Sequence, residues 1–296
     1  VLLPAFAIFG EAFWALRHPS AVRASAYLAD AVLDFGFAAL FNLAYPWFSL
    51  GYFARTITLV LYTSAGLARL FLAVRMSNGA KGLLHHTASG WIRVIAGIIM
   101  LALIPGMAAK HPKDGVPIQY PVIQGDWYVA QGGGSAFVNH HYSVSEQRYS
   151  LDLVRLDRAG RSYAGSPSSL ESYVAWGSQV VAPVSGLVVT AVDGLPDMEI
   201  EKRDQENPAG NHVEIETGDG VRIFLCHLRY GSVAVREGSM VNAGEVVGEV
   251  GNSGNTTQPH LHIQAMRQSS KGAWEGIPLE VRGAALHRGQ ILRAGQ

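Results

Sequence analysis

The residues best suited to chemistry in this chain include a histidine pair, His260 and His262, that follows Pro259. Residues two apart on a β-strand project from the same face, so both imidazoles are expected to point the same way. Residues 251–255 before them are Gly, Asn and Ser, which favour turns and tolerate a positive φ. Two adjacent imidazoles suit a metal ion and its bound water. A solvent-exposed pair on an edge strand is the alternative interpretation.

A third histidine, His227, lies in another strand-like segment, residues 223–228. A hydrolytic zinc ion usually has three protein ligands and a water in the open fourth position. The ion lowers the pKa of that water, so hydroxide becomes available to attack an amide carbonyl. A neighbouring imidazole can accept a proton and return it to the leaving amine. This chemistry needs about three ligands and one or two free imidazoles.

Four ordered motifs surround these histidines. They are V-x-A-P-V-x-G-x-V (residues 180–188), C-H-L (226–228), a run of regularly spaced Val and Gly (235–254) and P-H-L-H-I (259–263). Together they resemble the lysostaphin-like (LytM-type) zinc endopeptidases, which cleave peptide cross-bridges in bacterial cell walls. The resemblance covers roughly residues 125–270 and implies a mainly antiparallel β domain of the duplicated hybrid motif type. Short valine-rich segments between Gly, Pro and Asn turns favour the same β class.

The resemblance implies a role for each histidine and a Zn²⁺ cofactor. The second histidine of the H-x-H pair is a zinc ligand in that family, here His262, whereas the first, here His260, is catalytic. The histidine before leucine in the upstream strand, here His227, is also catalytic. The other two ligands come from an H-x-x-x-D motif, whose aspartate matches Asp152. The position four residues earlier is Arg148, which cannot bind zinc.

The segment over residues 139–152 offers a replacement for the missing ligand. It resembles a variant of the family in which an N-x-H histidine, followed by Q-R-Y-x-x-D, takes the ligand position. This variant assigns His141 as a metal ligand together with Asp152, and His140 remains the alternative. Arg148 is then expected to hold a substrate carboxylate or the outer oxygen of Asp152.

Residues 1–110 are dominated by apolar runs of a length that approaches a membrane span. The four runs are Val1–Leu16, Ala24–Phe53, Thr56–Val74 and Trp91–Ala109. They predict an α-helical membrane domain of about four spans, in contact with membrane lipid. The Lys and Arg of the short loops favour cytoplasmic first and third loops and both termini outside. Asp30 and Asp34 lie one helical turn apart and are expected near the lipid headgroups or paired with Arg23.

The rest of the chain divides into three further parts. Residues 111–124 are expected to be a linker, residues 125–270 the metallopeptidase domain, and residues 271–296 a surface extension or frayed tail. Within the domain, the charged loop over residues 194–211 is long enough to border a groove. The one cysteine, Cys226, is interpreted as a small buried apolar residue that faces away from its neighbour His227.

The charge pattern limits the function further. Residues 1–115 hold nine Lys/Arg and four Asp/Glu, whereas residues 116–296 hold fourteen and nineteen. The second part therefore lacks the basic stripe that nucleic-acid binding needs. The prediction is a multi-pass cell-membrane protein with a periplasmic or extracellular C-terminal domain. That domain would be a zinc metalloendopeptidase acting on cross-bridge or stem peptides of peptidoglycan.

Two alternatives remain. A catalytically silent LytM-like module would bind or regulate cell-wall hydrolases, and Arg148 in a ligand position favours it. A carrier domain of the biotinyl or lipoyl kind would need a lysine at a hairpin tip. The sequence has no lysine between Lys202 and Lys271, which argues against that carrier.

Overall fold

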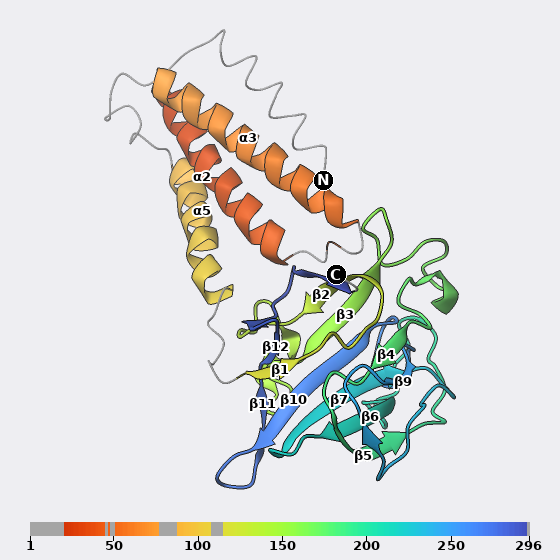
Figure 1. The fold of residues 1–296 in the computed structure, drawn as a ribbon. Helices are drawn as coiled ribbons and strands as arrows, with labels where there is room; N and C mark the ends of the chain where they lie inside the picture. Colours follow the sequence, from red (N-terminus) through yellow and green to blue (C-terminus); the bar gives the residue numbers. More distant parts are fainter. Residues whose placement is uncertain (1–20, 45–46, 48–50, 77–87, 108–114, 295–296) are drawn as a thin grey trace. The chain divides into compact units, whose positions relative to one another are not determined.

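The long apolar runs near the start of the chain form helices, the structure that pairs its backbone N–H and C=O groups within one segment. The protein is described here by a computed structural model that covers residues 21–44, 47, 51–76, 88–107 and 115–294. It comprises a helical unit and a β unit, and Figure 1 labels most of their elements. The helical unit consists of α2 (Ala21–Ala44), α3 (Tyr52–Met76) and α5 (Ala88–Met107).

Two ion pairs connect the three helices. Asp30 on α2 pairs with Arg93 on α5, and the Asp34 carboxylate accepts a 2.7 Å hydrogen bond from Arg69 on α3. The side chain of Arg23, the expected partner, lies outside the described residues, and the structure gives both carboxylates arginine partners inside the helical unit. The physical reason is that a charge among apolar helices is costly unless an opposite charge compensates it.

Glycines bring α2 and α5 into close backbone contact. A Cβ added to Gly97 on α5 would lie 2.5 Å from the carbonyl oxygen of Val32 on α2, and one on Gly36 would lie 2.7 Å from that of Gly97. Small residues at such crossings are typical of helices that pack within a membrane.

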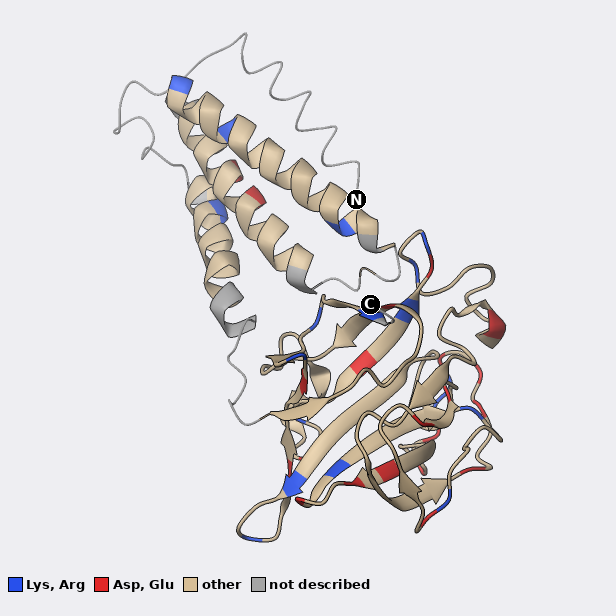
Figure 2. Cartoon of the chain, in the orientation of Figure 1, with Lys and Arg blue, Asp and Glu red and all other residues tan. Residues whose placement is uncertain are grey.

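By length and composition, two of the described helices could cross a membrane, over Ala24–Asn42 and Phe53–Met76. The apolar stretch Ser89–Leu103 in α5 is shorter. The run predicted over Ala24–Phe53 is in fact divided, because α2 ends at Ala44 and α3 begins at Tyr52. The first predicted span, Val1–Leu16, lies outside the described residues. Figure 2 shows few Lys, Arg, Asp or Glu residues on the three helices.

The β unit is built on a nine-stranded sheet with the order β14-β2-β3-β10-β7-β6-β5-β8, and β11 pairs with the end of β10. All pairings in this sheet are antiparallel. Its strands are β2 (Gly125–Gln131), β3 (Leu151–Leu156), β5 (Gly186–Val192), β6 (Asn211–Glu216), β7 (Val221–Leu228), β8 (Met240–Val241), β10 (Leu261–Gln268), β11 (Trp274–Ile277) and β14 (Ile291–Ala294).

Two smaller sheets and two short 3₁₀ turns complete the β unit. One sheet holds β1 (Val116–Ile118), β12 (Leu279–Val281) and β13 (Ala284–Ala285), and the other holds β4 (Gln179–Val181) and β9 (Val246–Glu249). The 3₁₀ turns are η2 (His140–Ser143) and η3 (Leu170–Ser172). The expectation of a mainly antiparallel β domain is therefore confirmed, with β1 and β12 as a parallel pair.

The main hydrophobic core lies on one face of the large sheet. Leu153 on β3, Leu225 on β7 and Ile263 on β10 are fully buried in it. Because side chains alternate along a strand, the residues between these leucines and isoleucines project from the opposite face. Asp152 on β3 and His262 and Gln264 on β10 therefore lie on that opposite face, away from the main core.

The segments expected to be a linker and a tail both contribute strands. Strand β1 lies within the predicted linker 111–124, and β11 to β14 lie within the predicted extension 271–296. On β14, Leu292 is 5% exposed and lies opposite the fully buried Trp127 of β2. These strands are short and weakly patterned, so their pairing depends on neighbours that are distant in sequence.

Leu292→Ala should therefore lower the free energy of unfolding of the β unit by about 2–5 kcal/mol, the usual cost of truncating a buried leucine. Pulse proteolysis of the full chain across a urea series would measure the change. Leu187→Ala is the matched control, since Leu187 is 40% exposed on β5 and should change stability by no more than about 0.5 kcal/mol. Equal effects of the two substitutions would show that β14 is a peripheral tail.

Candidate metal centre

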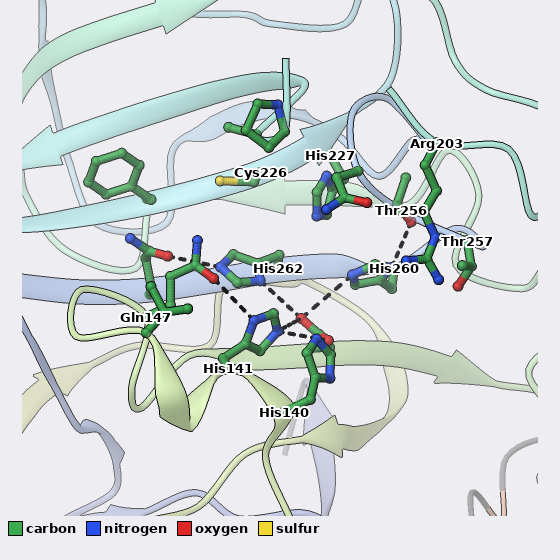
Figure 3. A pocket seen from close by; sticks show the side chains of 17 residues that line it. His140, His141, Gln147, Arg203, Cys226, His227, Thr256, Thr257, His260 and His262 are labelled. Atoms are coloured by element: carbon green, nitrogen blue, oxygen red, sulfur yellow. Dashed lines mark hydrogen bonds and ion pairs between the residues drawn. The ribbon is translucent and has the colours of Figure 1, made fainter. Parts of the chain in front are cut away.

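The centre lies where β3, β10 and β7 run side by side, on the sheet face opposite the main core. Asp152 on β3 is directly opposite His262 on β10, and His262 is directly opposite Cys226 on β7. Directly paired residues on adjacent strands share a face of the sheet. The register therefore places a carboxylate, an imidazole and a thiol in one row, and Figure 3 shows the side chains that surround them.

His227 reaches the same pocket by a departure from strand geometry. Alternation would place it on the face opposite Cys226, yet both side chains line one pocket. The backbone of His227 has a φ of +64°, a conformation that residues other than glycine rarely adopt. Its amide donates to Ala209 O and its carbonyl accepts from Gly251 N, which hold this strained residue in place. The expectation that Cys226 and His227 face opposite ways is wrong for this reason.

Cys226 nevertheless fits the interpretation of a buried, small apolar residue. It is 4% exposed, and burial raises the pKa of its thiol well above the usual value. A thiol that stays protonated is a poor nucleophile and a poor metal ligand.

Asn139 positions the two histidines of the N-terminal segment. Its side-chain oxygen accepts from the His141 amide at 3.1 Å, which caps the 3₁₀ turn η2. Its Nδ2 lies within 3.2–3.3 Å of the carbonyl oxygens of Gly133, Arg148 and Ser150. Because the backbone turns here instead of running extended, the rings of His140 and His141 lie next to each other, with centroids 3.9 Å apart and planes inclined by 41°. An extended segment would have directed them to opposite sides.

Four imidazoles share one pattern of hydrogen bonds. In each, one ring nitrogen lies 2.8–3.2 Å from an amide or carbonyl oxygen, which can only accept a proton. The pairs are His141 Nδ1 with Gln147 Oε1, His262 Nε2 with Gln264 Oε1, His227 Nδ1 with Ser253 O, and His260 Nδ1 with Gln258 O. That nitrogen therefore carries the hydrogen, and in the neutral ring the other nitrogen presents a lone pair.

Two of these lone pairs point directly at the Asp152 carboxylate. His141 Nε2 is 3.1 Å from both carboxylate oxygens, and His262 Nδ1 is 3.0 Å from Oδ1. When both rings are neutral, these two nitrogens and the carboxylate are all acceptors, so a cation between them would satisfy all three. Ligand atoms of a tetrahedral zinc ion at about 2.0–2.1 Å are separated by about 3.3 Å. The separations from Asp152 to His141 and from Asp152 to His262 are close to that value, so these two contacts are compatible with zinc.

His140 adds a further nitrogen to this cluster. One ligand atom of each of His140, His141 and Asp152 lies within 4.8 Å of the other two. However, His140 is exposed, whereas the His141 ring is fixed by Gln147 and directed at Asp152. The geometry thus favours His141 over His140 as the first ligand.

The electrostatics of the pocket separate the two remaining histidines. Burial, together with His260 and His262, lowers the pKa of His227 well below its usual value. Burial disfavours the charged form of His260 as well, but Asp152, 3.6 Å away, outweighs it and raises the pKa of His260. Burial likewise opposes ionisation of Asp152, yet His141 and His260 hold the pKa of its carboxyl well below the usual value. His227 is therefore a neutral proton acceptor and Asp152 an ionised carboxylate.

The structure places all five predicted site residues in one pocket, which is lined by His141, Asp152, His227, His260 and His262. Arg148 is not among its lining residues in the described part of the chain. Its guanidinium lies over the ring of Tyr142, 5.4 Å from the centroid, and not at Asp152 as expected. The predicted groove loop 194–211 does border the pocket, through Arg203, Pro208 and Ala209.

Sequence reasoning overlooked two glutamines of the pocket, Gln147 and Gln264. Gln264 lies two residues after His262 on the same strand, so alternation alone could have placed it on the metal face. Gln147 carries no comparable signal, because its position depends on the turn that Asn139 caps.

Gln264→Met should weaken zinc binding about 10–100-fold, because it removes the acceptor that directs the lone pair of His262 towards Asp152. Gln264→Glu keeps an acceptor and should bind zinc much as the wild type does. Gln268→Met, on the exposed end of the same strand, is the matched control. Chelator competition measures the affinity, and equal values for the two methionine variants would contradict this role.

Part of the sequence matches a known protein family. Residues 169–273 match the model of Peptidase family M23. The match includes His227, His260 and His262 but begins after His141 and Asp152.

Several relatives match a similar length of sequence. DD-carboxypeptidase/endopeptidase Mpg of Neisseria meningitidis is 37% identical over 89 residues, which are 30% of this chain and 19% of the relative. Glycyl-glycine endopeptidase ALE-1 of Staphylococcus capitis is 37% identical over 84 residues, 28% of this chain and 23% of the relative. The chain thus spans about a fifth of the length of these curated relatives.

Among solved structures, the catalytic domain of the antimicrobial peptidase lysostaphin from Staphylococcus simulans is similar. It is 26% identical, with a TM-score of 0.24, and the alignment covers 39% of this chain and 86% of that one. The β unit of this chain therefore contains a match to Peptidase family M23 over residues 169–273.

Proposed function

We propose that this chain is a membrane-anchored zinc metallopeptidase that hydrolyses peptide bonds of cell-wall peptidoglycan. The observation that carries the proposal is the convergence of two imidazole lone pairs on a buried, ionised carboxylate, beside two further imidazoles. The relatives point to the same class, since their names include a DD-carboxypeptidase/endopeptidase, a peptidoglycan DD-endopeptidase and a glycyl-glycine endopeptidase.

In this proposal His141, Asp152 and His262 hold the zinc ion. A bound zinc ion supplies an electrophile for the peptide carbonyl and lowers the pKa of a water molecule. Gln147 and Gln264 keep the two ligand imidazoles in the tautomers that offer Nε2 and Nδ1, respectively. The ligands come from two adjacent strands and one capped turn, so the donor set is pre-organised.

His227 and His260 have the catalytic roles. Their ring centroids are 4.9 Å apart, and each ring has its Nδ1 hydrogen donated to a backbone carbonyl. The Nε2 of His227 is therefore available to substrate and water, whereas the Nε2 of His260 lies 3.6 Å from the Asp152 carboxylate. The lowered pKa of His227 keeps it neutral, so it can accept a proton from water. The raised pKa of His260 favours a protonated ring, which can stabilise negative charge on the carbonyl oxygen or protonate the leaving amine.

The silent-module alternative loses its main support from the position of Arg148. That arginine lies over Tyr142, and His141 lies beside Asp152 where the missing ligand is needed. A binding module would have no need to fix four imidazole tautomers around one carboxylate. The observations therefore favour the enzyme.

The proposed location rests on the helical unit. Helices α3 and α5 expose many large apolar side chains, among them Phe71 at 62% and Ile92 at 67%. A soluble helix rarely presents so wide an apolar surface, whereas lipid contact explains it. Together with the loop charges, this supports a multi-pass anchor with the β unit on the outer side of the membrane.

Removing a ligand should differ from removing a catalytic imidazole. His141→Ala, Asp152→Asn and His262→Ala should lose both bound zinc and peptide hydrolysis, because each removes one of three ligands. His227→Ala and His260→Ala should retain zinc and lose about 10²–10⁴-fold in turnover. Elemental analysis and hydrolysis of purified peptidoglycan by the full chain measure the two properties.

His140→Ala is the control for the first ligand and should retain zinc better than His141→Ala. A wild-type chain that takes up no zinc after reconstitution would contradict the proposal and favour the silent module. Loss of zinc in His227→Ala would show that His227 is a metal ligand and that the ligand and catalytic roles have been assigned to the wrong residues.

Reporter fusions test the topology. A reporter fused after Gln296 should be active only if it works outside the cytoplasm, because the loop charges place both termini outside. The matched control is a fusion after Lys81, in the third predicted loop, which should give activity only from a cytoplasmic reporter. A cytoplasmic reporter active after Gln296 would rule out a cell-wall substrate.

A further inference from the structure

The loop over residues 194–211 forms a fixed wall of the pocket. Backbone amides of Met198, Glu201 and Asp204 donate to the carbonyl oxygens of Asn252, Thr257 and Gly254 at 2.9–3.0 Å. The Asp197 carboxylate also accepts from the Asn252 amide at 2.7 Å. The loop is therefore attached to the segment that leads into His260, on both sides of Arg203.

Arg203 projects from this wall into the pocket. Figure 3 shows its side chain extending towards His260 and Thr257. The residue two positions earlier, Glu201, has a φ of +66°, a turn that a non-glycine residue adopts only when its surroundings require it. The backbone before Arg203 is thus held in a defined turn.

Two acidic neighbours of Arg203 in its own loop, Glu199 and Asp204, have other partners. Glu199 pairs with Lys202 at 2.8 Å. The Asp204 carboxylate accepts from the amides of Glu206 and Asn207 and from the Asn207 side chain. Within the described part of the chain, Arg203 itself has neither an ion pair nor a hydrogen bond. A guanidinium directed into a pocket without a protein partner remains free to bind an anion.

The charges of the pocket favour an anionic occupant. Among the described residues that line it, Arg203 is the one Lys or Arg and Asp152 the one carboxylate. Asp152 is already surrounded by imidazoles. A carboxylate of a bound peptide would therefore meet Arg203 without a further acid among the residues that line the pocket.

We propose that Arg203 binds a carboxylate of the substrate peptide next to the bond to be cleaved. In calling the peptide a substrate, this inference rests on the proposed peptidase function. It directs the site to peptides that carry a free carboxylate close to that bond and away from uncharged bridges of glycine. Arg203 is then a residue that determines specificity, and its contribution appears in binding, with turnover of a bound peptide unaffected.

The test compares the binding of two probes, N-acetyl-triglycine and its C-terminal amide, to the full chain in neutral detergent. The probes differ only in the carboxylate. Both chelator-treated and zinc-reconstituted protein are used, because a metal ion would attract a carboxylate by itself. The variants are Arg203→Gln, Arg203→Lys and the matched control Lys202→Gln, an exposed neighbour that pairs with Glu199.

In both metal states, Arg203→Gln should weaken binding of the carboxylate probe about tenfold, the size expected for one charge-assisted hydrogen bond. Binding of the amide probe should not change. Arg203→Lys should be intermediate, since it keeps the charge but loses the planar fork. Lys202→Gln should behave as the wild type, and the difference between the probes should shrink with added salt because Arg203 is exposed.

Equal weakening of both probes by Arg203→Gln, or an unchanged preference for the carboxylate, would overturn the inference. The two proposals fail separately. An Arg203-dependent preference in a chain that neither binds zinc nor hydrolyses peptides would contradict the peptidase and support the anion site. Peptide hydrolysis with no effect of Arg203 on the preference between the probes would support the peptidase and contradict the anion site.

Discussion

The centre depends on one cross-strand pair, in which Asp152 on β3 lies opposite His262 on β10. A buried carboxylate is costly unless positive charge or hydrogen-bond donors compensate it. Here two of the nearest groups, at 3.0–3.1 Å, are imidazole nitrogens whose hydrogens are committed elsewhere. A cation among them would satisfy all of these acceptor atoms and so remove the cost of burying them together. The arrangement is therefore understandable as a binding site and poorly explained as a contribution to the stability of the fold.

The sheet imposes this pair through its register. Strand β10 is held between β3 and β7, and its core face carries Leu261 and Ile263, both fully buried. A shift of one residue would expose both and bury His262 in the core, so the main core fixes the position of the metal-facing residues. The strong apolar alternation of the strand thus stabilises the fold and places the chemistry at the same time.

Two local features complete what the regular sheet cannot supply. The left-handed backbone conformation of His227 directs its imidazole into the pocket, whereas regular strand alternation would have directed it to the other face. The cap at Asn139 converts a loop into a 3₁₀ turn and brings His141 to Asp152 across eleven residues of sequence. Both are local departures from regular geometry, which are common where a side chain must be directed at a functional site.

The sequence by itself determined the β class, the apolar helices and the sharing of one face by His260 and His262, because these follow from short-range periodicity. It also identified His141, Asp152 and His227 by family resemblance, without any geometry. Only the tertiary structure decided that Arg148 lies away from the pocket, that Asp30 and Asp34 pair with Arg93 and Arg69, and that Gln147, Gln264 and Arg203 line the pocket. The tertiary structure also determined that residues 274–294 contain the strands β11 to β14. The reason is physical: each of these outcomes depends on partners far away in the chain, or on a backbone turn that no local pattern encodes.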